Sequence, residues 1–185
     1  MNRVAYAFRL CVLMSIALIA SCSRQSTPNK VTQGDVRFEI RQAVNPGTLH
    51  STKEDAMASL GGNVPPNLEI LKSKERQTNG NTVQGWYVVD KTALVTASDL
   101  RYARPKQATL FGSVYQVAFK LDPTATEKFR EWTKANTGSI VAVVLDGVVV
   151  SAAVVKSEIS GGEVFIEGAF TKQEAENLSA KLSRG

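Results

Sequence analysis

The sequence of 185 residues contains only two cysteines and a single histidine. Cys11 lies within an apolar segment near the N-terminus and Cys22 follows that segment, so we expect no disulfide and no thiol nucleophile in the rest of the chain. Zinc centres of the usual kind need several thiolates or imidazoles, and His50 stands alone in a polar stretch. These shortages predict a protein that binds no metal and carries no cofactor.

The sequence also has few of the patterns that mark enzymes. Its serines do not lie in a G-x-S-x-G elbow, and Gly161 and Gly162 precede an expected strand, whereas a phosphate-binding loop precedes a helix. Asp122 and Asp146 already have structural roles, as a helix cap and a turn residue. The other candidates for acid–base chemistry are Asp90, Asp99, Glu167, Lys91 and Lys106. Because none of them has an evident catalytic partner, we expect a protein that is not an enzyme.

The net charge of +5 is small, and Arg3 and Arg9 account for two of these charges. Acidic and basic residues are interspersed along the rest of the chain. A nucleic-acid-binding protein would show a basic block or a basic strip with aromatic residues. Nucleic acid is therefore not an expected partner.

One apolar run, residues 10–20, follows Arg3 and Arg9 and is shorter than the about 20 residues that a membrane-spanning helix needs. This pattern predicts a secretory signal peptide over residues 1–21. The run ends in Ile19-Ala20-Ser21-Cys22, which resembles the lipobox of bacterial lipoproteins, where the cysteine carries the lipid. The alternative is an ordinary signal peptide that is cut at a small residue, with the cysteine incidental.

A lipid on Cys22 would hold the protein at a membrane through a polar tether, residues 22–35. We therefore expect a lipid-anchored protein on the periplasmic side of the cell envelope. Ser23 stands where an aspartate would retain a lipoprotein in the inner membrane of enteric bacteria, and by resemblance to that rule the outer membrane is favoured.

Residues 36–185 read as one folded domain in which strand and helix patterns alternate. Alternating apolar residues predict strands at 36–41, 113–121 and 163–167, and short apolar or β-branched runs predict strands at 68–71, 85–90, 140–145 and 148–155. Capping residues and helical spacing predict helices at 51–60, 96–103, 122–135 and 171–182. The expected caps are capping boxes between Ser51 and Glu54 and between Thr171 and Glu174, a cap between Thr96 and Asp99, and Asp122 followed by Pro123 at the first helical position. The order after residue 113 predicts an α+β fold, an antiparallel sheet with helices packed on one face, with ferredoxin-like topology as the leading arrangement.

The strongest local pattern is the pair Asp146-Gly147 between two β-branched runs, which predicts a hairpin with a type I′ turn. The run 140–155 is apolar on both faces. It is either buried on both sides or exposes an edge that accepts an extended peptide. The candidate protein-contact residues are the hairpin tip, Asp146 and Gly147, and the next turn, Gly161 and Gly162.

Four segments of the C-terminal half carry a resemblance to a known family: VAFKLD at 117–122, VVLDGVVVSA at 143–152, ISGG at 159–162 and IEGAFTKQEA at 166–175. In this order they resemble the first periplasmic domain of the SecD family of protein-export membrane proteins. Residues 113–185 match best and residues 36–112 more loosely. The family usually has a proline after the Ser-Ala at 151–152, where this chain has Ala153.

The resemblance implies a protein-binding role, with Sec translocon components, exported polypeptide or another envelope protein as the partner. The chain stops at Gly185, where the family would enter its transmembrane helices, so we expect the domain without its proton-driven motor. A structural envelope lipoprotein that reuses the fold without an export role is the alternative.

Overall fold

The computed structural model describes residues 36–44, 48–77, 79–108 and 114–183. These residues belong to one compact unit, Gly34–Gly185. The expected signal peptide, the tether and Cys22 lie outside the described residues. Within the described ranges, no helix is long and apolar enough to cross a membrane.

Eight strands and three α-helices follow one another along the described chain. They are β1 (Phe38–Ala43), α1 (Lys53–Ala58), β2 (Leu68–Arg76), β3 (Thr82–Thr96), β4 (Leu100–Gln107), β5 (Tyr115–Leu121), α2 (Pro123–Ala135), β6 (Ile140–Leu145), β7 (Val148–Val154), β8 (Glu163–Phe170) and α3 (Lys172–Leu182). A short 3₁₀ helix, Ala97–Asp99, connects β3 to β4.

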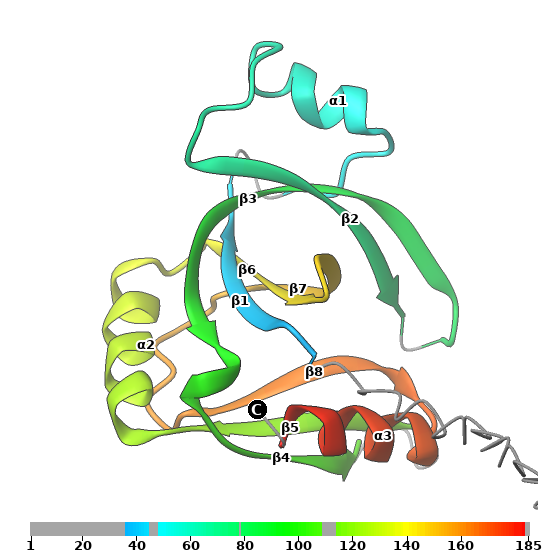
Figure 1. Cartoon of the computed structure of the whole chain (residues 1–185), viewed down its shortest axis with the longest axis vertical. Coiled ribbons are helices and arrows are strands. Elements are labelled where there is room, and N and C mark those ends of the chain that lie inside the picture. The colour runs from blue at the N-terminus through cyan, green and yellow to red at the C-terminus, as the bar shows by residue number, and fades with distance from the viewer. Residues whose placement is uncertain (1–35, 45–47, 78, 109–113, 184–185) are drawn as a thin grey trace, which may run out of the picture. The chain divides into compact units, whose positions relative to one another are not determined.

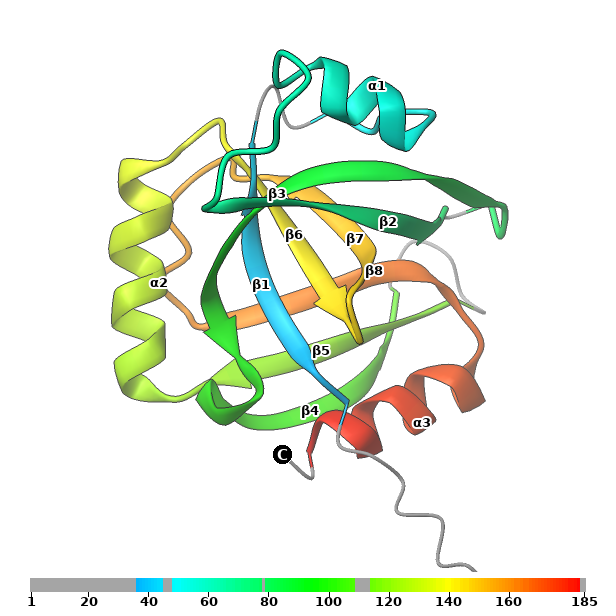
Figure 2. The same cartoon turned by 45° about the horizontal axis from the view of Figure 1, so that its top comes forward.

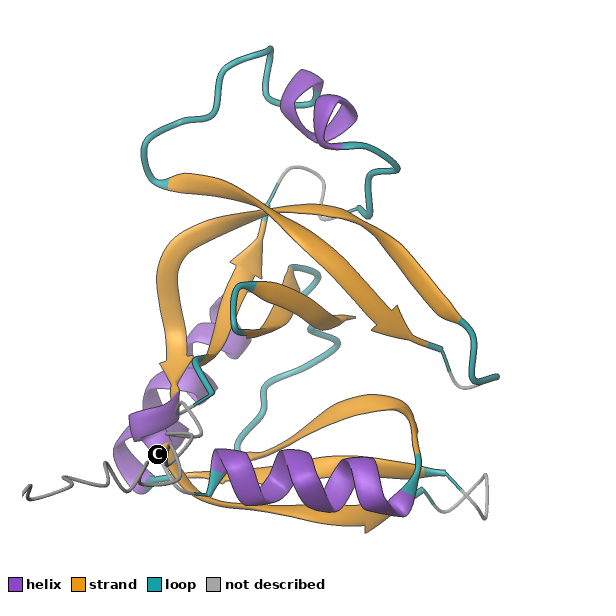
Figure 3. Cartoon of the chain, turned by 45° about the vertical axis from the view of Figure 1, so that its right-hand side comes forward, coloured by secondary structure: helices purple, strands orange, loops and turns teal. Residues whose placement is uncertain are grey.

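The strands form two sheets (Figure 1). Five close into a barrel in the order β1-β3-β2-β7-β6, and three form a separate sheet in the order β4-β5-β8. Helix α3 lies along the three-stranded sheet (Figure 3). The predicted α+β class is confirmed. The strands divide between two sheets instead of sharing one, so the single-sheet, ferredoxin-like topology is not confirmed.

The barrel closes because strands pair across long stretches of sequence. β1 lies between β3 and β6 and is antiparallel to both, with Phe38 opposite Leu145 (Figure 2). β3 pairs with β2 along its first part and with β1 along its last part. Register shifts around Arg41 bend the ladder between β1 and β3, which is the usual effect of a bulge.

The caps and turns follow the sequence closely. Asp122 accepts a hydrogen bond from the Ala125 amide at 2.7 Å, and Pro123 opens α2, as predicted. The predicted capping box at the start of α3 is present between Thr171 and Glu174. The box expected at Ser51 and Glu54 is not formed: Thr52 is the N-cap of α1, and its hydroxyl accepts from the Asp55 amide at 3.0 Å.

The hairpin turn also has the predicted geometry, whereas one helix prediction was wrong. Asp146 and Gly147 have φ angles of 50° and 80°, the positive values that a type I′ turn needs. The cap between Thr96 and Asp99 exists, but it opens only one 3₁₀ turn. The residues from Leu100 onward form β4, because pairing with β5 outweighs the local helix preference.

Two clusters of buried side chains hold the domain together. The larger cluster joins the barrel to the three-stranded sheet, and at its centre the rings of Phe38 and Phe119 meet edge to face, with centroids 5.1 Å apart. The smaller cluster fills the barrel between β3, β6 and β7. Val143 belongs to the first cluster and Ala142 and Val144 to the second, so β6 is buried on both sides. Val154, near the end of β7, is 51% exposed.

Candidate functional site

The barrel is joined most narrowly between β2 and β7. These strands run parallel and share a single residue pair, Ser73 with Val149. Just beyond it a side chain makes the connection: the Glu75 carboxylate accepts hydrogen bonds from the Ser73 hydroxyl at 3.0 Å and from the Ala152 amide at 3.2 Å. We call this region the seam.

Tyr87 of β3 completes the polar group at the seam. Its side chain is buried, and burial, followed by the charge of Glu75 and the hydrogen bond to it, raises the pKa of Tyr87 well above its usual value. The phenol therefore stays neutral and donates to the Glu75 carboxylate. Glu75 thus accepts hydrogen bonds from Ser73, Ala152 and Tyr87, and it thereby connects β2, β3 and β7.

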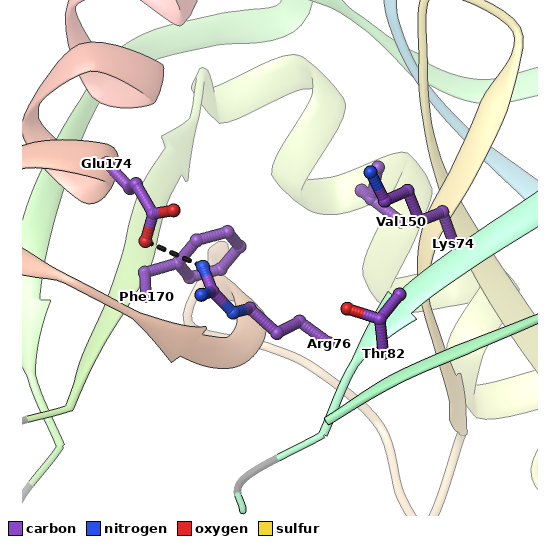
Figure 4. Close-up of a pocket in the computed structure, with 6 residues that line it drawn as sticks. All are labelled: Lys74, Arg76, Thr82, Val150, Phe170 and Glu174. Carbon is purple, nitrogen blue, oxygen red and sulfur yellow. Dashed lines mark hydrogen bonds and ion pairs between the residues drawn. The ribbon is translucent and has the colours of Figure 1, made fainter. Parts of the chain in front are cut away.

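Two adjoining cavities lie along the seam, between the barrel and the end of the three-stranded sheet. The larger has a volume of about 320 Å³ and the smaller about 150 Å³. Both are lined by Arg76 and Val150, and we call them together the seam cleft. The larger cavity is also lined by Lys74, Thr82, Phe170 and Glu174 (Figure 4). The smaller is also lined by Glu75, Gln77, Ser151, Ala152, Glu167 and Gly168.

One ion pair crosses the larger cavity from β2 to the first turn of α3. The Arg76 guanidinium lies 2.7 Å from the Glu174 carboxylate (Figure 4). Glu174 also accepts from the Thr171 amide at 2.8 Å and from the Thr171 hydroxyl at 3.0 Å. Arg76 first, and then the Thr171 amide, lower the pKa of Glu174 to about 2. The carboxylate is thus charged at every physiological pH.

We expect Glu174→Gln to lower the free energy of unfolding at pH 7 by no more than about 1 kcal/mol, because the ion pair is largely exposed to solvent. The folded-state pKa is depressed, so this contribution is complete above about pH 4.5 and is lost as the pH falls toward 2. Denaturant titrations at pH 7 and pH 3 should show the variant and the parent converging at the lower pH. Glu176→Gln, which removes an i,i+4 pair with Lys172 on the same helix, is the control.

The residues predicted as protein contacts lie in two other turns. The hairpin tip is exposed. It is hydrogen-bonded to the residue before β1: the Asp146 carboxylate accepts from the Arg37 amide at 3.0 Å, and the Asp146 amide donates to the Arg37 carbonyl at 2.9 Å. Gly161 is exposed and Gly162 is buried beside the start of α2. Neither turn lines the seam cleft, and their role as protein contacts stays a prediction.

Gly162 has a structural role that the sequence did not reveal. Its φ is +60°, and an added Cβ would lie 2.2 Å from the Thr126 hydroxyl oxygen. We expect Gly162→Ala to cost about 1–3 kcal/mol in the free energy of unfolding, from backbone strain and overlap together. Gly161→Ala, which meets nothing within 4 Å, should cost less than about 0.5 kcal/mol in the same denaturant titration. Equal losses for the two variants would contradict this account.

The seam cleft was not predicted from the sequence. Residues 72–81 of the sequence are recognisable only as a charged segment before an Asn-Gly turn. In the structure β2 continues to Arg76, and its charged residues alternate: Lys74 and Arg76 face the larger cavity, whereas Glu75 faces the seam. In the sequence, the basic residues of 72–76 recur at every second position, with Ser73 and Glu75 between them, and this period of two is the pattern that indicates a strand.

A family model described as the SecDF P1 head subdomain matches residues 69–185, which include every residue that lines the seam cleft. The chain belongs to this family. The resemblance to SecD stated from the sequence is thereby confirmed, while a stand-alone lipoprotein remains a prediction.

Named relatives agree with this assignment. The protein translocase subunit SecD of Calditerrivibrio nitroreducens is 37% identical over 126 residues, which cover 67% of this chain and 24% of the relative. The SecD subunit of Koribacter versatilis is 34% identical over 157 residues, or 84% of this chain and 28% of the relative. The chain thus spans about a quarter of the length of these curated relatives.

A solved structure described as "a membrane component SecDF that enhances protein export" has a similar fold. The match has a TM-score of 0.55 and 25% sequence identity, and it covers 82% of this chain and 63% of that chain. The similarity supports the α+β fold of the described residues.

Proposed function

We propose that this chain is a non-catalytic, protein-binding domain that is held on the periplasmic side of the envelope by a lipid on Cys22 and assists Sec-dependent protein export. The family supports the export context, because the relatives are named translocase subunits. The observation that carries the binding role is the seam cleft, where the barrel and the edge of the three-stranded sheet meet.

The cleft has the features of a site for an extended polypeptide. β8 is an edge strand of its sheet, and β7 shares only one residue pair with β2. Strand edges of this kind bind extended chains through backbone hydrogen bonds. Val150 and Phe170 supply an apolar surface in the larger cavity, and the surrounding walls are polar. Binding sites commonly combine an apolar floor with a few polar groups that set orientation.

In-cell photo-crosslinking tests this function. A photoreactive amino acid at Thr82, which lines the cleft, is compared with one at Asp146 in the hairpin tip and one at Lys128 on the exposed side of α2. We expect adducts with newly exported polypeptides or Sec translocon components from Thr82 and none from Lys128. Adducts from Asp146 would add the hairpin tip to the binding surface.

Other outcomes contradict the proposal. Adducts to an unrelated envelope protein alone would replace the export role with that of a structural envelope lipoprotein. The absence of adducts from both Thr82 and Asp146 would contradict a protein-binding role for either surface.

The lipid anchor has its own test. We expect Cys22→Ser to abolish incorporation of radiolabelled palmitate and to move the protein from the membrane fraction to the soluble periplasmic fraction, because one cysteine carries the anchor. Cys11→Ser, within the signal peptide, should change neither property. Palmitate that persists on the Cys22→Ser protein would show that the cysteine is incidental.

A further inference from the structure

The larger cavity of the seam cleft has a surplus of positive charge. Lys74 and Arg76 project from one side of β2, and Glu174 is the only acidic residue among the described residues that line this cavity. Among the described residues Lys74 has no ion-pair partner. Arg76 is held by Glu174, but 35% of its side chain remains accessible to solvent.

Glu174 can release Arg76 without losing all of its own hydrogen bonds. Its carboxylate keeps the amide and hydroxyl of Thr171 as donors, because it belongs to the capping box of α3. An incoming carboxylate could therefore replace Glu174 at the Arg76 guanidinium while Glu174 stays satisfied at the helix end. Guanidinium groups bind carboxylates through two parallel N–H donors, which makes this exchange geometrically simple.

The apolar part of the cavity indicates which kind of side chain would lie next to the carboxylate of a bound polypeptide. Val150 and Phe170 lie beside the two cations (Figure 4), and the volume of about 320 Å³ is at the small end for a binding pocket. Such a cavity accommodates a few side chains of an extended polypeptide. In the smaller cavity, Glu75 is already committed to Ser73 and Ala152, and Glu167 is acidic, so the anion site is confined to the larger cavity.

We propose that the seam cleft selects polypeptide segments in which an acidic side chain stands next to an apolar one, with Arg76 and Lys74 binding the carboxylate in place of Glu174. This inference rests on the proposed polypeptide-binding function and adds the chemical class of the segment that is bound. The observation that supports it is the charge complementarity between an acidic side chain and the cations Lys74 and Arg76.

Fluorescence anisotropy with two labelled peptides tests the proposal on the full chain, extracted from membranes in detergent. The peptides have nine residues, alternate valine and threonine, and differ only in a central Asp-Phe or Asn-Phe pair. We expect the Asp peptide to bind about fivefold to tenfold more tightly at low salt, and this preference to shrink at high salt, because the cations are partly exposed.

Variants separate the cleft from general charge effects. Arg76→Gln and Lys74→Gln should each reduce the preference for the Asp peptide over the Asn peptide. Glu174→Gln should strengthen binding of the Asp peptide, because it removes the competing carboxylate. Lys72→Gln is the matched control, since Lys72 is an exposed cation on the same strand and does not line the cavity. It should leave both affinities unchanged.

The outcomes distinguish this inference from the function on which it rests. Equal affinity for the two peptides would overturn the acidic specificity and leave polypeptide binding in place. Failure of both peptides to bind would overturn both. A preference that survives Arg76→Gln and Lys74→Gln but is lost in Lys72→Gln would place the anion site outside the cleft and also overturn the inference.

Discussion

Replacing Phe119 with alanine is expected to lower the free energy of unfolding by about 3–5 kcal/mol, among the largest effects of any single change in this domain. Phe119 of β5 is fully buried and meets Phe38 of β1 edge to face. It therefore belongs to the cluster that joins the barrel to the three-stranded sheet. Alanine would leave a cavity at the junction that neither sheet can fill by itself.

Denaturant unfolding followed by tryptophan fluorescence measures this effect. Trp86 lies in β3 of the barrel and Trp132 in α2, so two single-tryptophan proteins, Trp86→Phe and Trp132→Phe, report on different parts of the domain. If the shared cluster makes the domain one cooperative unit, Phe119→Ala shifts both transitions together. Transitions that separate would show that the barrel and α2 unfold independently, which would contradict a single cooperative unit. Tyr102→Ala, at an exposed position of β4, should cost less than about 0.5 kcal/mol.

Replacing Arg41 with methionine is expected to cost about 3–5 kcal/mol, because it removes the buried cation that pairs with two carboxylates at the barrel wall. Only 5% of the Arg41 side chain is exposed, in the middle of β1. Its guanidinium lies 2.6 Å from the Glu39 carboxylate and also pairs with Glu69 of β2. Glu39 itself is only 12% exposed, so its charge cannot be fully hydrated once the arginine is gone.

The same strand provides the control for this prediction. Arg37 also pairs with Glu39, at 3.0 Å, but 67% of its side chain is exposed, so Arg37→Met should cost less than about 1 kcal/mol. Combining Arg41→Met with Glu39→Gln and Glu69→Gln should recover much of the lost stability in thermal and denaturant unfolding. A loss below about 1 kcal/mol for Arg41→Met alone would mean that the acids regain water without rearranging the barrel.

Features that depend on neighbouring residues were predictable from the sequence. Asp122 and Thr171 cap helices where expected, and Asp146-Gly147 forms the hairpin turn, because each structure is decided within a few residues. The division into two sheets was not predictable in this way. The β-branched runs at 140–145 and 148–155 predict two paired strands, but they do not show that β6 pairs with β1 on its other side.

The candidate site was not predictable from the sequence either, because it too depends on tertiary structure. Its walls come from β2, β3, β7, β8 and α3, and none of the local patterns in these elements indicates a cavity. Glu174 was recognised only as part of a capping box, and its second contact, with Arg76, depends on tertiary structure. The family resemblance was detectable because it rests on the order of several local patterns.

The position of β1 also determines when the barrel can form during synthesis. β1 pairs with β6, and Ser73 of β2 pairs with Val149 of β7. The first barrel strands in the sequence therefore cannot complete their pairing until the last barrel strands are present. A nascent chain that has not yet exposed residue 149 cannot close the barrel. Such distant pairings give a high contact order and slow folding, on a scale of about milliseconds to seconds. Closure of the barrel therefore requires residues 38 to 149 to be present together, which is most of the domain.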